Sequence, residues 1–592
     1  MADSPIGIGA WLRREWRLTL LLFAAALLLY LPGIRWGLPY ATAADRVHPW
    51  GGDELAPLGP IAELYSVFVD PTPTFNPQYP LFHYVMQALL CAPYLAVLLL
   101  KGGLAHPSIT YPYGLADPVT ALATLTILAR LVSLLMAAGV VVAAAYTGSV
   151  LWNRRTGIIA GVLTLIMYPM FYYARTSNVD MGALFWTSLG LAVFARCLRD
   201  GLTVRRAASL GALAALATAT KDPSYAVFVT VAIVLLLRLP RQLHAPGSRL
   251  ADAWRGPVVG LLTGVTVYAI ASGLLFSPER FIQHVLFVIH GSPQGRGIFY
   301  GATPATIAGY VKLLGEALRY CVDAWGVPTT IFVASGLALS FRRTPSRLAF
   351  AAPALGIPLG IILPTRSVEF RHLIPTAYVL AFFAAYALCE LFRAKSPQLR
   401  RIAPLALAVV CGWSLLRAAD LTYQMLHDSR YELAAWLRQH TVPGDRVAYF
   451  GAPLKLPPIE THVRTEPAPW QRIYRRSPPG TSPDIILVIP QQRFEAVHEW
   501  TLPDTIFRGL NDGSLGYRPV LFLQTRSLFS RRPIPFVNPP VRVFARERRV
   551  GGVLEESAVN SRNVLSESAQ HFRLKITIVS PPARPMTIAS KG

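Results

Sequence analysis

The sequence predicts an α-helical, polytopic membrane protein that carries a small α/β domain at its C-terminal end. Hydrophobic residues make up 53% of the 592 residues and charged residues only 15%, whereas a soluble domain contains about 25% charged residues. Long apolar stretches recur as far as residue 418, several of them near the roughly 20 residues that cross a bilayer. After residue 419 they give way to short segments that are typical of strands.

The Arg-rich connections between the apolar stretches predict how these stretches are oriented. Cytoplasmic loops carry an excess of Lys and Arg, so clusters such as 152–155, 196–206 and 392–401 should lie in the cytoplasm. All of the clusters fall on that side only if 80–101 does not cross the membrane. We therefore predict about eleven spans, a cytoplasmic N-terminus, and a segment 80–101 that is re-entrant or lies along the outer surface. The apolar stretches are 17–33, 80–101, 120–150, 157–173, 181–198, 206–220, 223–239, 256–276, 325–341, 347–363, 373–392 and 402–418.

This orientation divides the chain into two predicted domains. Residues 1–418 form a transmembrane domain whose first outer loop, 34–119, contains the sequence "HPWGGDE". Residues 419–592 form an extracytoplasmic domain in which 428–440 has helical spacing. The predicted strands of this domain are 446–451, 484–490, 518–525 and 575–580.

Charge and cysteine content exclude other classes of protein. A net charge of +24 often indicates binding to nucleic acid. Here the Arg residues lie in short clusters between apolar runs, and no basic face or recognition motif occurs. The five cysteines lie in or beside apolar runs without paired spacing, which excludes a disulfide framework and a zinc site. Membrane lipids, and not nucleic acid, are the expected surroundings.

Polar residues gather in the connections that are predicted on the outer face. Ionisable groups near a bilayer are costly and are commonly functional, so we expect a site there in which carboxylates meet cations. Simpler explanations stay open: a loop turn for Asp53 and Glu54, a helix cap for Asp180, and an interfacial anchor for Lys221. The residues are Asp53, Glu54, Arg175, Asn178, Asp180, Lys221, Asp222, His284, His290, Arg296, Arg366, Glu369, Arg371 and His372.

Such a set suits the transfer of a sugar from a lipid phosphate. The departing phosphate is already a weak base and needs neutralisation, which Arg supplies through bidentate contacts and Lys as a point charge. The acceptor hydroxyl needs a general base, and a carboxylate can accept its proton. A displacement of this kind inverts the anomeric carbon. The prenyl chain would lie in an apolar groove between spans.

The order of the motifs resembles the GT-C superfamily of membrane glycosyltransferases. The resemblance is to the branch of the protein O-mannosyltransferases and the bacterial lipid A aminoarabinose transferase, and it extends over about residues 45–380. The matching pieces include "HPWGGDE", "FNPQYPLFHYVMQALL", "MYPMFYYARTSNVDMGALFW", "GALAALATATKDPSYAVF" and "VEFRHLIPTAYVL". In the family, the acidic pair of the first outer loop includes the catalytic base.

The resemblance implies roles for individual residues of this chain. Asp53 would be the catalytic base and Glu54 would assist it. Asp180 would be the acidic residue of a second outer loop. The cations that are expected to bind the donor phosphate are Arg371, His372, Arg366, Lys221 and Arg175.

The chain also departs from the pattern of its relatives. Many of them place His-Pro directly before Asp-Glu, whereas Trp50-Gly51-Gly52 separates His48-Pro49 from Asp53 here. Some relatives hold a divalent metal between two acidic loops. Asp53, Glu54 and Asp180 offer the oxygen ligands that Mg²⁺ or Mn²⁺ prefers, so a divalent cation is an open cofactor.

These observations predict an inverting glycosyltransferase of the hexosyl or pentosyl class. Its donor would be a polyprenyl-phosphate sugar, and its acceptor a hydroxyl of a glycan, lipid or protein at the outer face of a bacterial inner membrane. One alternative is a transporter or flippase of a lipid-linked or anionic substrate, although the internal repeats typical of transporters are not evident. Another is a non-catalytic assembly protein whose soluble domain binds a partner.

Overall fold

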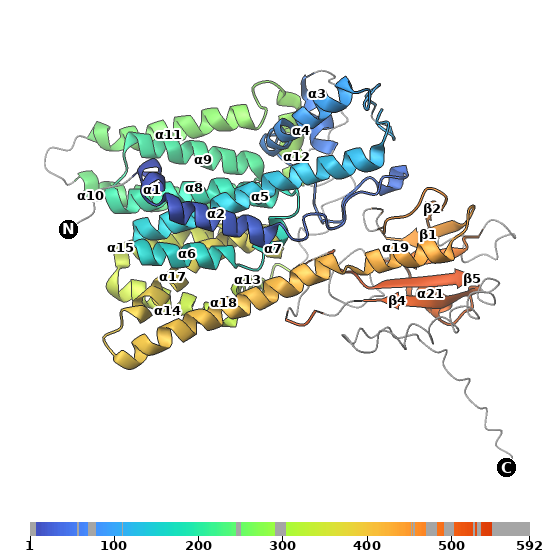
Figure 1. Cartoon of the computed structure of the whole chain (residues 1–592). Helices are drawn as coiled ribbons and strands as arrows, with labels where there is room; N and C mark the ends of the chain where they lie inside the picture. Colours follow the sequence, from blue (N-terminus) through green and yellow to red (C-terminus); the bar gives the residue numbers. More distant parts are fainter. Residues whose placement is uncertain are drawn as a thin grey trace, which may run out of the picture.

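The chain folds into a helical bundle and a small sheet domain that lies beyond one end of the bundle (Figure 1). The computed structural model describes residues 7–55, 58–68, 78–108, 110–243, 250–290, 303–451, 453, 456–468, 482–489, 502–524, 527–529, 534 and 536–546. The helices of the N-terminal half are α1 (Ile8–Arg14), α2 (Trp16–Tyr30), η1 (Ala44–Arg46), α3 (Gly59–Phe68), α4 (Phe82–Leu100), α5 (Pro118–Leu151), α6 (Arg154–Leu165), α7 (Met170–Tyr173), α8 (Val179–Asp200), α9 (Val204–Thr220), α10 (Ser224–Leu243) and α11 (Leu250–Ala271). They are followed by α12 (Pro278–His290), α13 (Ile307–Trp325), α14 (Val327–Arg343), α15 (Pro345–Leu348), η2 (Ala349–Leu355), η3 (Pro358–Ile362), α16 (Leu363–Thr365), η4 (Phe370–Leu373), α17 (Ile374–Phe392), α18 (Pro397–Leu426), α19 (Ser429–His440) and α21 (Asp504–Asn511).

The bundle contains several helices that suit a membrane. Within the described residues, seven helices are long and apolar enough to cross one, or eight if α13 and α14, which meet at 110°, count as one span. Two shorter apolar helices, Trp16–Tyr30 and Ser224–Leu239, accompany them. The chain is thus an integral membrane protein with a helical membrane domain and a C-terminal sheet domain, as the sequence predicts. The number of about eleven spans stays a prediction.

Three elements of the structure differ from what the apolar stretches suggest. The stretch 157–173 is two helices, α6 and α7, because Pro169 lies at the break between them. Residues 277–324, which none of the predicted apolar stretches covers, contain α12 and α13, whose mixed polar and apolar faces give no continuous apolar run. The predicted domain boundary at 418/419 falls inside α18, which continues to Leu426 and leads directly to α19 (Figure 1).

Glycines allow close packing of the helices. A Cβ atom on Gly211 of α9 would lie 2.0 Å from the carbonyl oxygen of Gly260 in α11. A Cβ atom on Gly148 of α5 would lie 2.9 Å from the Cα atom of Gly157 in α6. Small residues let helix backbones approach where apolar side chains gain little over lipid, which is how helices associate in membranes.

Helix α4 corresponds to segment 80–101, which was predicted not to cross the membrane. The polar contacts of α4 described next lie at the end of the bundle that faces the sheet domain. A Cβ atom on Gly182, in the first turn of α8, would lie 2.7 Å from the His83 ring. Gln87 donates to the carbonyl of Ser177 at 3.2 Å, and Cys91 lies 4.0 Å from the carbonyl of Leu125 near the start of α5. Helix α4 is also one of the seven helices that are long and apolar enough to cross a membrane, so the non-crossing path of 80–101 stays a prediction.

The sheet domain has five strands in the order β2-β1-β3-β5-β4. The strands are β1 (Arg446–Phe450), β2 (Arg464–Pro467), β3 (Ile485–Val488), β4 (Tyr517–Leu523) and β5 (Val541–Arg546). β1 pairs in parallel with β2 and β3, whereas β5 is antiparallel to β3 and β4. The predicted strands 446–451, 484–490 and 518–525 are confirmed, and β2 and β5 were not predicted. The predicted strand 575–580 lies outside the described residues.

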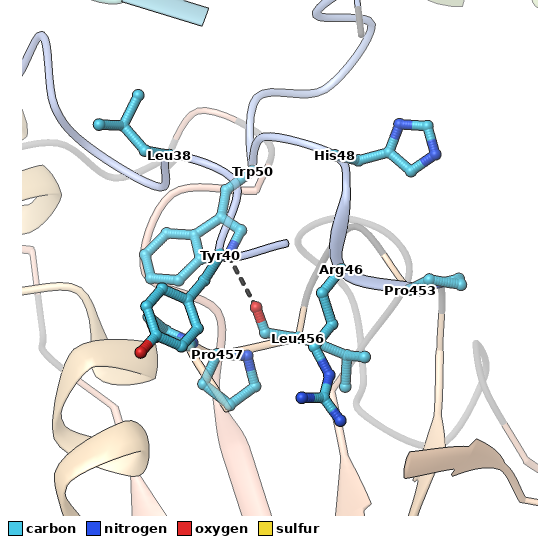
Figure 2. Close-up of a pocket in the computed structure, with 9 residues that line it drawn as sticks. Leu38, Tyr40, Arg46, His48, Trp50, Pro453, Leu456 and Pro457 are labelled. Carbon is cyan, nitrogen blue, oxygen red and sulfur yellow. Dashed lines mark hydrogen bonds between the residues drawn. The ribbon is translucent and has the colours of Figure 1, made fainter. Parts of the chain in front are cut away.

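The sheet domain is bound to the first outer loop of the membrane domain. Buried Arg46 donates to the carbonyls of Ile459 and Val463, each at 2.9 Å. The Trp50 indole donates to the carbonyl of Leu456 at 2.8 Å, and a small cavity between the two segments is lined by residues that include Arg46, His48 and Trp50 (Figure 2). The outer loop and the sheet domain therefore share one packed interface.

We expect α4 to leave residue 101 on the same side of the membrane as the sheet domain. After replacement of the native cysteines by serine, Lys101→Cys should react with a membrane-impermeant maleimide in intact cells or oriented vesicles together with Ser514→Cys. Lys395→Cys, between α17 and α18, should react only after permeabilisation. Labelling of Lys101→Cys together with Lys395→Cys would mean that α4 crosses the bilayer.

Candidate active site

The loop that carries Asp53 has a conformation that its two preceding glycines make possible. Asp53 itself has a left-handed backbone, with φ +56°, which is uncommon for a residue with a side chain. A Cβ atom on Gly51 would lie 2.2 Å from the Glu54 carboxylate, and one on Gly52 would lie 2.0 Å from the ring of Phe536. Gly52 also donates its amide to the Tyr172 hydroxyl at 3.1 Å. The inserted Gly-Gly is therefore required by the packing on both sides of the loop.

Glu54 forms a buried ion pair with Arg130 of α5. The guanidinium donates to both carboxylate oxygens, at 2.6 and 2.9 Å, and both side chains are fully buried. Glu54 also accepts from the amide and hydroxyl of Ser177, at 2.9 and 3.1 Å. The remaining Nη1 of Arg130 donates to the carbonyls of Ile34 and Trp36, at 2.7 and 2.6 Å. The pair joins three separate segments of the chain beneath Asp53.

This arrangement corrects the expected role of Glu54. The sequence assigned it an assisting part in catalysis, but its side chain has no exposed surface and both of its oxygens already have partners. It cannot reach an acceptor hydroxyl without breaking the pair. These contacts tie Glu54, directly after Asp53 in the chain, to α5 and to the segment before α8.

Asp53 forms an ion pair with Arg371, which follows the candidate span Pro345–Thr365 in the chain. Nη1 of Arg371 forms an ion pair with the Asp53 carboxylate. Nε of Arg371 lies 2.6 Å from the carboxylate of Glu369, which is 3% exposed. Asp53, Arg371 and Glu369 thus form a continuous chain of charge between the first outer loop and the segment before α17.

Asp180 forms a second ion pair, with Lys221. Asn178 caps the N-terminus of α8, because its side chain accepts a hydrogen bond from the amide of Asp180 at 3.2 Å. The helix cap that was considered as an alternative role for Asp180 is therefore formed by Asn178. Burial lowers the pKa of the Lys221 ammonium, and the carboxylate of Asp180 opposes this effect. Among the described residues, Oδ2 of Asp180 is buried and has no hydrogen-bond partner.

Tyr79, which was not predicted from the sequence, lies near both ion pairs. The charges of Arg371, Asp53 and Asp180 all act on its phenol, which accepts a hydrogen bond from Gln78 at 3.4 Å. Burial raises the pKa of Tyr79 far above its usual value, so the phenol is a neutral hydrogen-bond donor at physiological pH. Arg280 of α12 donates to the carbonyl of Tyr79 at 3.3 Å and holds Glu63 at 3.1 Å.

The structure brings four of the predicted site residues together and places one elsewhere. Asp53, Asp180, Lys221 and Arg371 form two ion pairs whose charges act on one another. Arg175 was expected to bind phosphate, but it is fully buried and donates to the carbonyls of Leu29 and Tyr30, at 2.9 and 2.8 Å, and to Thr422 at 2.9 Å. That prediction was wrong, because Arg175 ties the end of α2 to α18.

The remaining predicted residues lie around this cluster. Arg366 and His372 are half-buried on the segment that carries Arg371, and Arg366 has a left-handed backbone, with φ +51°. Asp222 lies 3.1 Å from His284 of α12. Arg296 lies outside the described residues, as does the side chain of His290.

The carboxylates as arranged do not fit a divalent metal. Asp53 and Asp180 each bind a cationic side chain, and Glu54 is saturated by Arg130 and Ser177. In the part of the chain that the structure describes, no group of three or more His, Cys, Asp or Glu side chains could hold a metal ion.

Comparisons with known proteins place solved membrane glycosyltransferases beside this chain. No family model and no curated protein matches it. ArnT from Cupriavidus metallidurans, in a crystal structure bound to undecaprenyl phosphate, is similar at 14% identity and a TM-score of 0.44, over 91% of this chain and 98% of that chain. The apo oligosaccharyltransferase from Archaeoglobus fulgidus is similar at 12% identity and 0.42, over 78% and 66%. The arabinofuranosyltransferase AftD from Mycobacteria is similar at 14% identity and 0.39, over 90% and 41%.

We expect single substitutions of the Glu54–Arg130 pair to destabilise the protein. Glu54→Gln or Arg130→Met leaves a buried charge without its partner, which typically costs about 3–5 kcal/mol. Unfolding in detergent should show the loss as a lower melting temperature. The double variant should be more stable than either single variant, because neither charge is then left unpaired. If the single variants unfold like the wild type, the pair does not hold the loop.

Proposed function

We propose that this protein is a membrane glycosyltransferase. Its donor is a sugar on a polyprenyl phosphate, and its acceptor is a hydroxyl group of a glycan, lipid or protein. The observation that carries the proposal is the position of Asp53, a half-exposed carboxylate fixed beside Arg371 and close to the Asp180–Lys221 pair. The apolar bundle next to this cluster would hold the prenyl chain.

The donor phosphate would bind to the cations of the cluster. A guanidinium gives two parallel hydrogen bonds to phosphate, and an ammonium gives a point charge. Arg371 and Lys221 are the cations of the two ion pairs, and Arg366 and His372 lie on the same segment as Arg371. Their charge would stabilise the phosphate as it gains negative charge on leaving, which is an interaction that strengthens in the transition state.

Asp53 would act as the general base. The acceptor oxygen attacks the anomeric carbon while the bond from that carbon to the phosphate oxygen breaks, and the proton of the hydroxyl passes to the Asp53 carboxylate. Attack opposite the leaving phosphate inverts the anomeric centre. The unpartnered Oδ2 of Asp180 and the neutral phenol of Tyr79 would bind sugar hydroxyls, because a buried polar atom is normally hydrogen-bonded.

Acceptor selection would involve the sheet domain. It contacts the Asp53 loop directly through Phe536, which lies against Gly52. We place this domain and the site on the outer face of a bacterial inner membrane, because the Arg-rich connections lie at the opposite ends of the helices. A site at one end of the bundle also favours an enzyme over a transporter, whose binding site is typically near the midplane.

We expect Asp53→Asn to lower the transfer rate by about 10²–10⁴-fold, which is the usual contribution of a general base. The assay would supply a panel of undecaprenyl-phosphate sugars with membrane extracts as acceptors, and would measure the undecaprenyl phosphate released. Glu279→Gln, an exposed acid at the start of α12, is the matched control and should stay fully active. Full activity of Asp53→Asn with an unchanged melting temperature would remove Asp53 as the base.

A further inference from the structure

Arg371 holds two carboxylates that differ in their access to solvent. The Asp53 side chain is 39% exposed, whereas the Glu369 side chain is 4% exposed. The two carboxylates also occupy different nitrogens, since Asp53 binds Nη1 and Glu369 binds Nε. One partner of the guanidinium can therefore be replaced from the open side while the other stays in place.

The two ion pairs contain more negative than positive charge. Asp53, Glu369 and Asp180 are anions, and Arg371 and Lys221 are the cations that face them. Each cation already has a carboxylate partner. A lipid phosphate that takes the Nη1 contact of Arg371 must displace Asp53, which is the more exposed of the two carboxylates on this guanidinium.

We infer that Glu369 is a positioning residue that holds Arg371 while its Nη1 exchanges Asp53 for the phosphate of the donor. This inference rests on the proposed function. Glu369 keeps the guanidinium at the edge of the site through Nε, so that the exchange changes one partner without moving the cation. Burial makes Glu369 suitable for this, because a pair shielded from water is screened less than an exposed one.

The exchange sets the order of events. While Arg371 binds Asp53, the carboxylate oxygen that meets Nη1 is occupied and cannot contact an incoming hydroxyl. When the phosphate takes Nη1, Asp53 is released beside the anomeric carbon and can accept the proton of the acceptor. Donor binding thus precedes activation of the acceptor.

A binding experiment separates this exchange from a simple charge effect. The probe is undecaprenyl phosphate added to the full-length protein in detergent, with undecaprenol, which lacks the phosphate, as the reference lipid. Asp53→Asn removes the competing anion and should bind undecaprenyl phosphate about two- to fivefold more tightly than the wild type, as for the loss of a partly exposed ion pair. Its affinity for undecaprenol should be unchanged. Glu279→Gln also removes one negative charge at this end of the bundle and should bind both lipids like the wild type.

Variants of Glu369 test the positioning role. Loss of a nearby negative charge by itself should tighten phosphate binding, whereas loss of the residue that holds Arg371 should weaken it. We expect Glu369→Ala to bind undecaprenyl phosphate several-fold more weakly than the wild type. Glu369→Gln keeps the size of the side chain but loses its charge, so it should also bind more weakly than the wild type, because the contact with Nε is an ion pair.

Each outcome decides between the possibilities. Tighter binding by Asp53→Asn with weaker binding by Glu369→Ala supports the exchange. Unchanged or weaker binding by Asp53→Asn, or tighter binding by Glu369→Ala, overturns it while the proposed donor class stands. If the wild type binds undecaprenyl phosphate no better than undecaprenol, the proposed donor class fails, and the exchange fails with it.

Discussion

The buried pair of Glu54 and Arg130 is the interaction on which the site depends. Two charges removed from water carry a large desolvation cost, which is balanced only when their geometry is good and their other hydrogen-bonding groups are satisfied. Both conditions are met here, by the two direct contacts and by Ser177, Ile34 and Trp36. The same contacts fix the start of the first outer loop, the start of α8 and the middle of α5 relative to one another.

The sheet domain fixes the same loop from the opposite side. Arg430 lies 3.8 Å from the centroid of the Trp50 ring and forms a buried pair with Asp428, which also accepts from the indole of Trp36 at 3.0 Å. Phe536 rests against Gly52. The unusual backbone of Asp53 is therefore held between the membrane helices and the sheet domain. A strained residue persists where the surrounding structure over-determines it, and such residues are common at functional sites.

The electrostatics of the site combine fixed and exchangeable contacts. Fully buried charges such as Glu54 and Arg130 have saturated hydrogen bonds and build the framework. Asp53 is partly open to solvent and meets a single cation, so that its contact can change during a reaction. The two adjacent acidic residues of this loop therefore have different surroundings, since Glu54 is fully buried and saturated whereas Asp53 is partly open to solvent.

Several features of the chain were determined by the sequence alone. Apolar length and low charge predict the membrane domain, and the change in composition after residue 419 predicts the sheet domain, because both depend on local patterns. The Arg clusters placed Asp53, Asp180, Lys221 and Arg371 at one end of the bundle. The sequence also contains a signal for the buried role of Arg130. It is the one Arg inside the apolar stretch 120–150, and an ionisable residue in such a stretch needs a partner.

Only the tertiary structure decided which partners these residues have. Residues 54 and 130, and residues 53 and 371, are brought into contact by the packing of distant helices, and periodicity carries no information about such pairs. The same limit explains why Glu54 was taken for a catalytic assistant and Arg175 for a phosphate ligand. A charged residue in an outer connection has the same appearance in sequence whether it faces the site or is buried against backbone carbonyls, since its burial and hydrogen bonds arise only when the segments pack together.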